Sequence, residues 1–199
     1  MTAERPAGRR VSPQERRERR AAVDDPAVVL EAAARFLEVR SRSAAEVRRR
    51  LTSAGYDPGL VEDAVTRLQE LGLLDDEAFA RAWIESRDRS RPRGERAIRQ
   101  ELGLKGVDRA SVDLVLAERR EAAMSVPPDD DGVTVSADQA AAERLLARNA
   151  RSLSRVADPR QRRQRAYALL ARNGFDPEVC RTVAAMVASD DAEDQIEPD

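Results

Sequence analysis

A short motif that occurs three times constrains this chain of 199 residues more than any other feature. It reads leucine, three residues, glycine, an apolar residue and aspartate, in the stretches LTSAGYD, LGLKGVD and LARNGFD. A helix that ends on a left-handed glycine brings the residue four before the glycine against the residue after it, as in the Schellman motif. The motif therefore predicts three structural turns between helices, at Gly55, Gly106 and Gly174.

The residues around each glycine fit the same turn. Each leucine is expected to contact the apolar residue that follows its glycine. The three pairs are Leu51 with Tyr56, Leu102 with Val107, and Leu170 with Phe175. The aspartate after each turn is an expected N-cap of the next helix, and Pro58 and Pro177 then stand at its first position, where a missing N–H is tolerated. Each motif thus predicts a helix, a tight turn and a second helix.

A further helix precedes each of these pairs, at residues 28–39, 76–88 and 137–153. Alanine, leucine, arginine and glutamate dominate the composition, which favours helix over strand. Ser43 and Glu46 have the spacing of a capping box. Repeats of this size cannot bury their apolar faces alone. We therefore predict an all-α fold of three tandem three-helix repeats, stacked into an elongated, curved array.

The repeats also predict the domain boundaries. The predicted segments are a disordered basic extension at 1–25, repeats at 26–74, 75–123 and 137–189, an acidic linker insertion at 124–136, and a disordered acidic tail at 190–199. The terminal segments are expected to be disordered because they are charged and lack apolar periodicity.

Composition argues against most catalytic chemistry. The chain has no histidine and one cysteine, Cys180, so an internal disulfide and Ser-His-Asp or Cys-His catalysis are excluded. Zinc and haem sites of the usual ligand types are nearly excluded too. No phosphate-binding glycine loop and no apolar run of about 20 residues occurs. We expect a cytoplasmic non-enzyme without metal or cofactor, in which Cys180 is a buried thiol at the position of Val61 and Val112.

Arginines gather before each signature glycine, although the net charge is only −2. Stacked repeats would place them along one side as a basic strip, which suits an elongated acidic partner such as nucleic acid or the groove of a protein filament. The candidate contacts are Arg48, Arg49, Arg50, Arg93, Arg96, Arg99, Arg162, Arg163 and Arg165. The alternative is that individual arginines are only solvent-exposed residues on helix faces. Arginine outnumbers lysine 34 to 1, which suggests a codon-composition bias and not a selected function.

Two further features have a functional and a structural interpretation. Phe36, Phe79 and Trp83 could serve as base-stacking platforms, but they fall on apolar helix faces and are expected in the core. The segment RGERAIRQEL from Arg93 could be the recognition helix of a helix-turn-helix. The same turn occurs three times, which favours a structural repeat instead.

The sequence also resembles a known family. The stretch GLLDDEAFARAWIESR from Gly72, followed by RAIRQELGLKGVD, is similar to the central part of RecX, the bacterial regulatory family that modulates the recombinase RecA. The segment SRSAAEVRRRLTSAGYDPGLVEDAVTRLQELGLLDD resembles the first unit of that family, and RAYALLARNGFD resembles the third. The resemblance spans residues 28–187 and implies three tandem three-helix repeats without catalytic residues. It leaves the N-terminal extension, the insertion and the tail outside the pattern.

The resemblance implies an inhibitory function. Members bind RecA, lodge in the groove of its nucleoprotein filament, and suppress ATP hydrolysis, strand exchange and co-protease activity, which limits recombination and the SOS response to DNA damage. It implies contacts at Arg48 to Arg50, Arg96 and Arg99. We therefore expect a monomeric modulator of RecA and the RecA-DNA filament. The alternatives are a helical module that binds DNA directly, or a passive helical adaptor for another protein.

Overall fold

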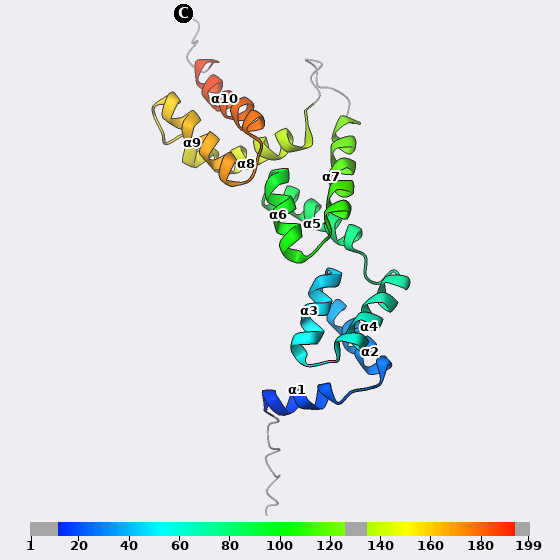
Figure 1. Ribbon diagram of the computed structural model, residues 1–199. Coiled ribbons are helices and arrows are strands. Elements are labelled where there is room, and N and C mark those ends of the chain that lie inside the picture. Colours follow the sequence, from blue (N-terminus) through cyan, green and yellow to red (C-terminus); the bar gives the residue numbers. More distant parts are fainter. Residues whose placement is uncertain (1–11, 126–134, 194–199) are drawn as a thin grey trace, which may run out of the picture. The chain divides into compact units, whose positions relative to one another are not determined.

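The computed structural model describes residues 12–125 and 135–193, and within these ranges the chain forms ten α-helices and no β-strand (Figure 1). The helices are α1 (Pro13–Ala21), α2 (Pro26–Leu37), α3 (Ala44–Ala54), α4 (Pro58–Glu70), α5 (Asp76–Ser90), α6 (Glu95–Lys105), α7 (Arg109–Met124), α8 (Ala137–Leu153), α9 (Pro159–Arg172) and α10 (Pro177–Glu193). The all-α prediction is confirmed. Most of the predicted acidic insertion and tail lies outside the described residues, but α10 continues to Glu193, into the segment for which disorder was predicted.

The chain divides into two compact units, residues 1–76 and 77–199. Three separate hydrophobic cores lie within them: α2, α3 and α4 share the first, α5, α6 and α7 the second, and α8, α9 and α10 the third. The prediction of three three-helix repeats is therefore confirmed, with the second and third repeats inside one unit. The stacking of all three into an elongated, curved array stays a prediction.

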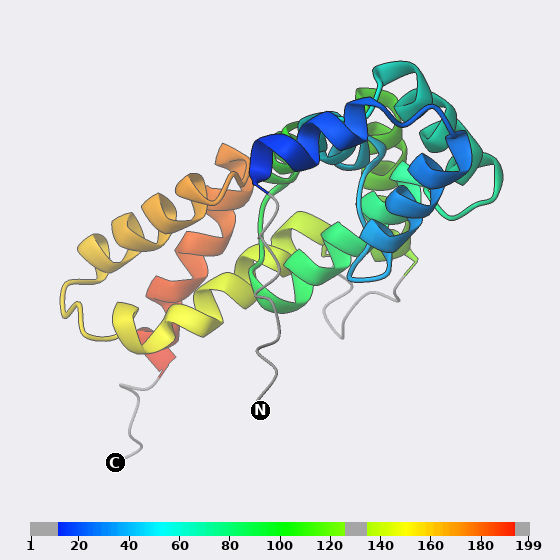
Figure 2. The ribbon, with the colours of Figure 1, turned by 90° about the horizontal axis from the view of Figure 1, so that it is seen from below.

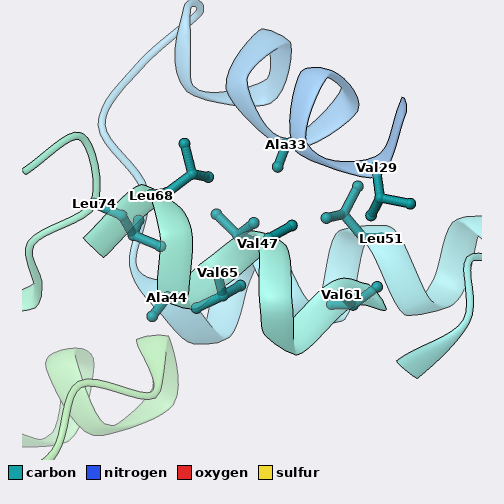
Figure 3. Close-up of a cluster of buried hydrophobic side chains, with 10 residues drawn as sticks. Val29, Ala33, Ala44, Val47, Leu51, Val61, Val65, Leu68 and Leu74 are labelled. Atoms are coloured by element: carbon teal, nitrogen blue, oxygen red, sulfur yellow. The ribbon is translucent and has the colours of Figure 1, made fainter. Parts of the chain in front are cut away.

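The buried side chains of the first core form a narrow stripe of alanine, valine and leucine. Figure 3 shows this core, to which α2, α3 and α4 contribute Val29, Ala33, Val47, Leu51, Val61, Val65 and Leu68. Along α4 the buried positions recur every three or four residues, as one face of a helix requires. Burying one such aliphatic side chain of valine or leucine size stabilises the fold by about 1.5–3 kcal/mol. A narrow core is enough to hold the repeat together because all three of its helices bury side chains in it.

The three signature turns have the geometry that the motif predicts. Gly55, Gly106 and Gly174 have φ angles of 106°, 81° and 81°, in the left-handed region. The amide that follows each glycine donates to the carbonyl of the motif leucine, at 3.3 Å from Tyr56 to Leu51 in the first repeat. Equivalent bonds of 3.1 and 3.4 Å close the other two turns. Each leucine and its apolar partner lie in or against the same core, as expected.

The predicted caps also form. Asp57 accepts hydrogen bonds from the amides of Gly59 and Leu60, and Ser43 and Glu46 complete a reciprocal capping box at the start of α3. Asp108 caps α7 in the same way, and hydrogen bonds from Ser111 lower the pKa of its carboxyl group. These local bonds set where the helices after the turns begin.

Residues 12–25 differ from the disorder that composition suggested. Ser12 and Glu15 form a capping box, and α1 follows it. The helix lies against the first signature turn, where a Cβ atom on Gly55 would stand 2.6 Å from Cγ of Arg17. Arg20 donates to the carbonyl of Ala54 at 3.4 Å. No residue of α1 is buried, so the capping box and this docking contact, more than a core, explain its order.

The same kind of contact joins the second and third repeats. A Cβ on Gly174 would stand 2.5 Å from the backbone nitrogen of Ala97, and one on Gly94 would stand 2.3 Å from the carbonyl oxygen of Gly174. The amide of Gly94 donates to the carbonyl of Asn173 at 3.1 Å. The start of α6 therefore rests on the third signature turn, as α1 rests on the first.

An ion-pair network lies at this contact between the second and third repeats, which we call the seam. Arg119, whose side chain is 8% exposed, bonds Asp88 at 2.9 Å and Asp138 at 2.7 Å. Asp138 also accepts from the first amide of α6, Glu95, and in the first unit Asp76 accepts in the same way from the first amide of α3. Burial raises the pKa of Asp138, while its bonds to Arg119 and to the Glu95 amide oppose that shift. Arg119 thus compensates two acidic groups at the seam.

The first prediction concerns the turn. Gly106→Ala should lower the free energy of unfolding by about 1–2 kcal/mol, because an L side chain is strained at a left-handed φ. The control is Gly103→Ala in the last turn of α6, where no atom would lie within 4 Å of the new Cβ and φ is not left-handed. It should be neutral or slightly stabilising. Chemical denaturation measures both, and equal stability of the two variants would contradict the turn.

The second prediction concerns the seam. Arg119→Met should destabilise the second unit by about 3 kcal/mol, because it leaves Asp138 partly buried without its countercharge and leaves Asp88 with only the longer pair to Arg144, at 3.6 Å. The control is Arg109→Met on the same helix, where the side chain is 93% exposed and an exposed pair contributes about 0–1 kcal/mol. Thermal unfolding followed by circular dichroism compares them. A shift no larger than that of the control would disprove the role of Arg119.

Candidate interaction surface

The candidate arginines differ in what they already bind. Arg48 pairs with Glu62 across the first turn, at 2.8 Å, and Arg99 pairs with Asp113 across the second. In both cases the partner comes from the helix after the turn. These two guanidinium groups join neighbouring helices, and much of their charge is neutralised within their own repeat.

Arg93 and Arg162 make contacts within the protein that stabilise the fold. Arg93 is half-buried, bonds the side chain of Asn173 in the third repeat, and lies 3.5 Å from Glu101. Arg162 is only 9% exposed, and its Nε donates to the carbonyl of Val156 at 3.0 Å. The structure therefore corrects the expectation that Arg162 is available to a partner. It closes the loop that leads into α9.

The other five candidates are exposed to solvent. Within residues 12–125 and 135–193, no acidic side chain pairs with any of them. They are Arg49, Arg50, Arg96, Arg163 and Arg165. Arg50 also lies 5.8 Å from the ring of Phe36. These guanidinium groups can contact an anionic partner without first breaking an internal ion pair.

Sequence reasoning missed several exposed arginines of the third repeat. Arg151, Arg155 and Arg172 flank the candidates on α8, on the loop after it and on α9, and are exposed. The signal was present in the sequence, because only one acidic residue, Asp158, lies between Glu143 and Asp176. The N-cap of α9 uses that aspartate, which accepts from the amide of Arg160 at 2.9 Å.

The three aromatic side chains considered as stacking platforms, Phe36, Phe79 and Trp83, offer no free stacking surface. Phe79 is buried, and Phe36 is half-buried with the guanidinium of Arg42 4.2 Å from its ring centre. Trp83 packs against the second core and donates its indole N–H to Glu101 at 2.9 Å. Arg87 lies 4.3 Å from the same ring. Cations and core residues cover these rings, as expected for structural positions.

The helix-turn-helix interpretation does not fit the packing. A recognition helix contacts bases with its N-terminal residues. Here the start of α6 rests on the turn at Gly174, and Gly94 bonds Asn173 there. The end of the helix that would enter a groove is therefore occupied by the third repeat.

The described residues contain no group of three acidic, cysteine or histidine side chains that could hold a metal ion. Cys180 is buried in the third core, and burial raises the pKa of its thiol, which keeps it protonated near neutral pH. In the same part of the chain, none of the helices has the length and apolar character that a membrane crossing requires.

Comparison with protein families identifies three matches along the chain. Residues 30–68 match the first three-helix domain of RecX, residues 75–116 the second, and residues 137–183 the third. Each match includes one signature turn. Together they cover the three repeats and leave out α1.

Individual proteins agree with these matches. The chain is 31% identical over 157 residues to Regulatory protein RecX of Mycobacterium ulcerans (strain Agy99), covering 78% of this chain and 83% of that protein. It is 32% identical over 148 residues to Regulatory protein RecX of Mycolicibacterium vanbaalenii, covering 71% and 72%. The crystal structure of RecX from Lactobacillus salivarius has the same fold, with a TM-score of 0.67 at 18% identity over 82% of this chain and 97% of that one.

Proposed function

Because the chain belongs to the RecX family of regulatory proteins, which are known as regulators of RecA, we propose that it binds RecA and the RecA-DNA filament and inhibits recombinase, ATPase and co-protease activity. It thereby limits recombination and the SOS response. The observation that carries this proposal is the match of all three repeats, in order, to the three RecX domains. The protein acts by binding as a cytoplasmic monomer, without catalysis or a cofactor.

The five exposed and unpaired arginines are the contacts that we propose for the RecA-DNA filament, through either its protein or its DNA. Arg49 and Arg50 lie on α3, Arg96 on α6, and Arg163 and Arg165 on α9, so the middle helix of every repeat contributes. The remaining candidates, Arg48, Arg93, Arg99 and Arg162, serve the fold. An elongated anionic partner that touches equivalent helices of successive repeats fits a filament groove.

The second candidate function is direct binding to DNA. The arginine-rich and nearly acid-free segment around α9 favours it, because phosphate groups attract unpaired arginines. This activity is compatible with inhibition of RecA, since one molecule can contact both protein and DNA in a filament.

The third prediction tests inhibition. Adding the protein at stoichiometric amounts to RecA on single-stranded DNA should suppress ATP hydrolysis. Replacing Arg49 and Arg50 together by glutamine should raise the concentration for half-inhibition by about tenfold, the change that a loss of 1.4 kcal/mol produces. The measurement is steady-state ATPase activity across a titration.

The matched control replaces Arg35 and Arg67 by glutamine. Both are exposed arginines of the same unit, and each pairs with a glutamate on its own helix. The control should inhibit as the wild type does. Unchanged ATPase with wild-type protein would refute the proposed function, and equal loss in both variants would show that net charge, not Arg49 and Arg50, matters.

A further inference from the structure

The third repeat carries an unusual concentration of positive charge. Residues 144–175 contain nine arginines and one acidic residue, Asp158, in a chain whose net charge is −2. Three of the nine serve the fold: Arg144 lies 3.6 Å from Asp88, Arg148 donates to the carbonyls of Arg89 and Ser90, and Arg162 is buried. The other six are exposed, and no acidic side chain of the described residues pairs with them. They are Arg151, Arg155, Arg160, Arg163, Arg165 and Arg172.

The second repeat shows that exposure alone does not leave an arginine unpaired. Arg81 is held between Glu77 and Glu118, at 3.1 and 2.7 Å, and these bonds keep its pKa above the ordinary value. Arg120 pairs with Glu95. The second repeat therefore neutralises much of its charge internally, whereas the third presents its charge to solvent.

Helix α9 presents this charge along its length, with Arg165 and Arg172 on one side of the helix and Arg160 and Arg163 on another. Both views show α9 beside α10 (Figures 1 and 2), and the two helices share the third core through Ala166 and Leu170 on the buried side of α9. The fourteen residues of α9 extend about 21 Å, and Arg165 and Arg172 are two turns apart on one side. One strand of duplex DNA has a phosphate for every 3.4 Å or so of its axis. The helix is thus long enough to follow several phosphates.

The composition of this face favours DNA over an acidic protein. The exposed positions of α9 hold arginine, glutamine, alanine and the first residue, Pro159, and the exposed large apolar side chain of this repeat is Met186, on α10. Protein interfaces centre on buried aromatic and aliphatic side chains, and this face has none to offer. Arginine and glutamine are the donors that bind phosphate and sugar oxygens.

We propose that the third repeat binds the phosphate backbone of duplex DNA through α9 and the loop before it, without RecA. The interaction is independent of base sequence, because phosphate contacts carry no sequence information. Single strands gain no advantage, because Tyr167, the aromatic residue of α9, is half-buried and offers no open face for stacking. The biological role of this contact rests on the proposed function, but the binding itself does not.

The experiment is fluorescence anisotropy with the full chain, a labelled 30-base-pair duplex and a matching single strand, over a series of salt concentrations. Wild-type protein should bind the duplex at low salt at least as tightly as the single strand. Replacing Arg160, Arg163, Arg165 and Arg172 together by glutamine should weaken duplex binding by at least about tenfold. It should also make the slope of log affinity against log salt shallower by about 3–4, since each lost phosphate contact contributes about 0.9.

The control replaces four ion-paired arginines of the second repeat, Arg81, Arg89, Arg109 and Arg120, by glutamine. It removes the same charge and should keep most of the wild-type slope. If the fourfold α9 variant loses helicity by circular dichroism, the double variant at Arg165 and Arg172 replaces it, with an expected slope change of about 2. An equal loss of binding in the control would overturn the proposal, because net charge alone would then explain binding.

The outcomes separate this inference from the proposed function. Absence of duplex binding at low salt, with normal inhibition of the RecA ATPase, would disprove the DNA contact and leave regulation of RecA standing. Duplex binding without ATPase inhibition would support the DNA contact and refute the proposed regulation of RecA. Loss of RecA capture by the α9 variant, in the absence of DNA, would assign this face to protein and also overturn the inference.

Discussion

A left-handed glycine after the middle helix is the constraint on which each repeat depends. At Gly55, Gly106 and Gly174 the backbone reverses at little cost, the motif leucine accepts a hydrogen bond across the turn, and an aspartate then caps the start of the next helix. The missing Cβ has a second consequence, because it allows another helix to lie directly on the turn. The start of α6 occupies the turn at Gly174, and α1 occupies the turn at Gly55. One local feature therefore builds the repeat and provides a surface where a neighbouring helix can dock.

Charge has two distinct uses in this fold. At the seam between the second and third repeats, Arg119 compensates Asp88 and Asp138, whose carboxylates would otherwise destabilise the interface. On the exposed faces of the second repeat, pairs such as Arg81 with Glu118 neutralise one another. The third repeat lacks these acidic partners along α9. A protein with a net charge of −2 can in this way present a strongly cationic helix to an anionic partner.

The proposed activities fit this uneven distribution. The first two repeats expose several large apolar side chains, among them Leu71, Leu73, Leu104 and Leu114. The face of α9 is suited to phosphate. The proposed regulation of RecA on DNA involves contact with both a protein and a nucleic acid. The RecX fold places different side chains on the exposed faces of successive copies of one three-helix unit. The signature turns repeat because every unit needs them, while the exposed faces are free to diverge.

The sequence by itself determined the helices, the three turns and most caps, because each depends on residues no more than about six positions apart. Leu51, Gly55, Tyr56 and Asp57 act together whatever lies around them. Only the tertiary structure decided which arginines are free: Arg48 and Arg99 find their partners on the next helix, and Arg162 reaches a loop carbonyl once α9 packs. The order of α1 was missed although the Ser12 and Glu15 capping signal was present, since a helix without buried residues also needs a surface to rest on. Local hydrogen bonds form between residues that are close in the sequence and can be predicted from it, but an ion pair between helices or a docked helix depends on how separate helices pack.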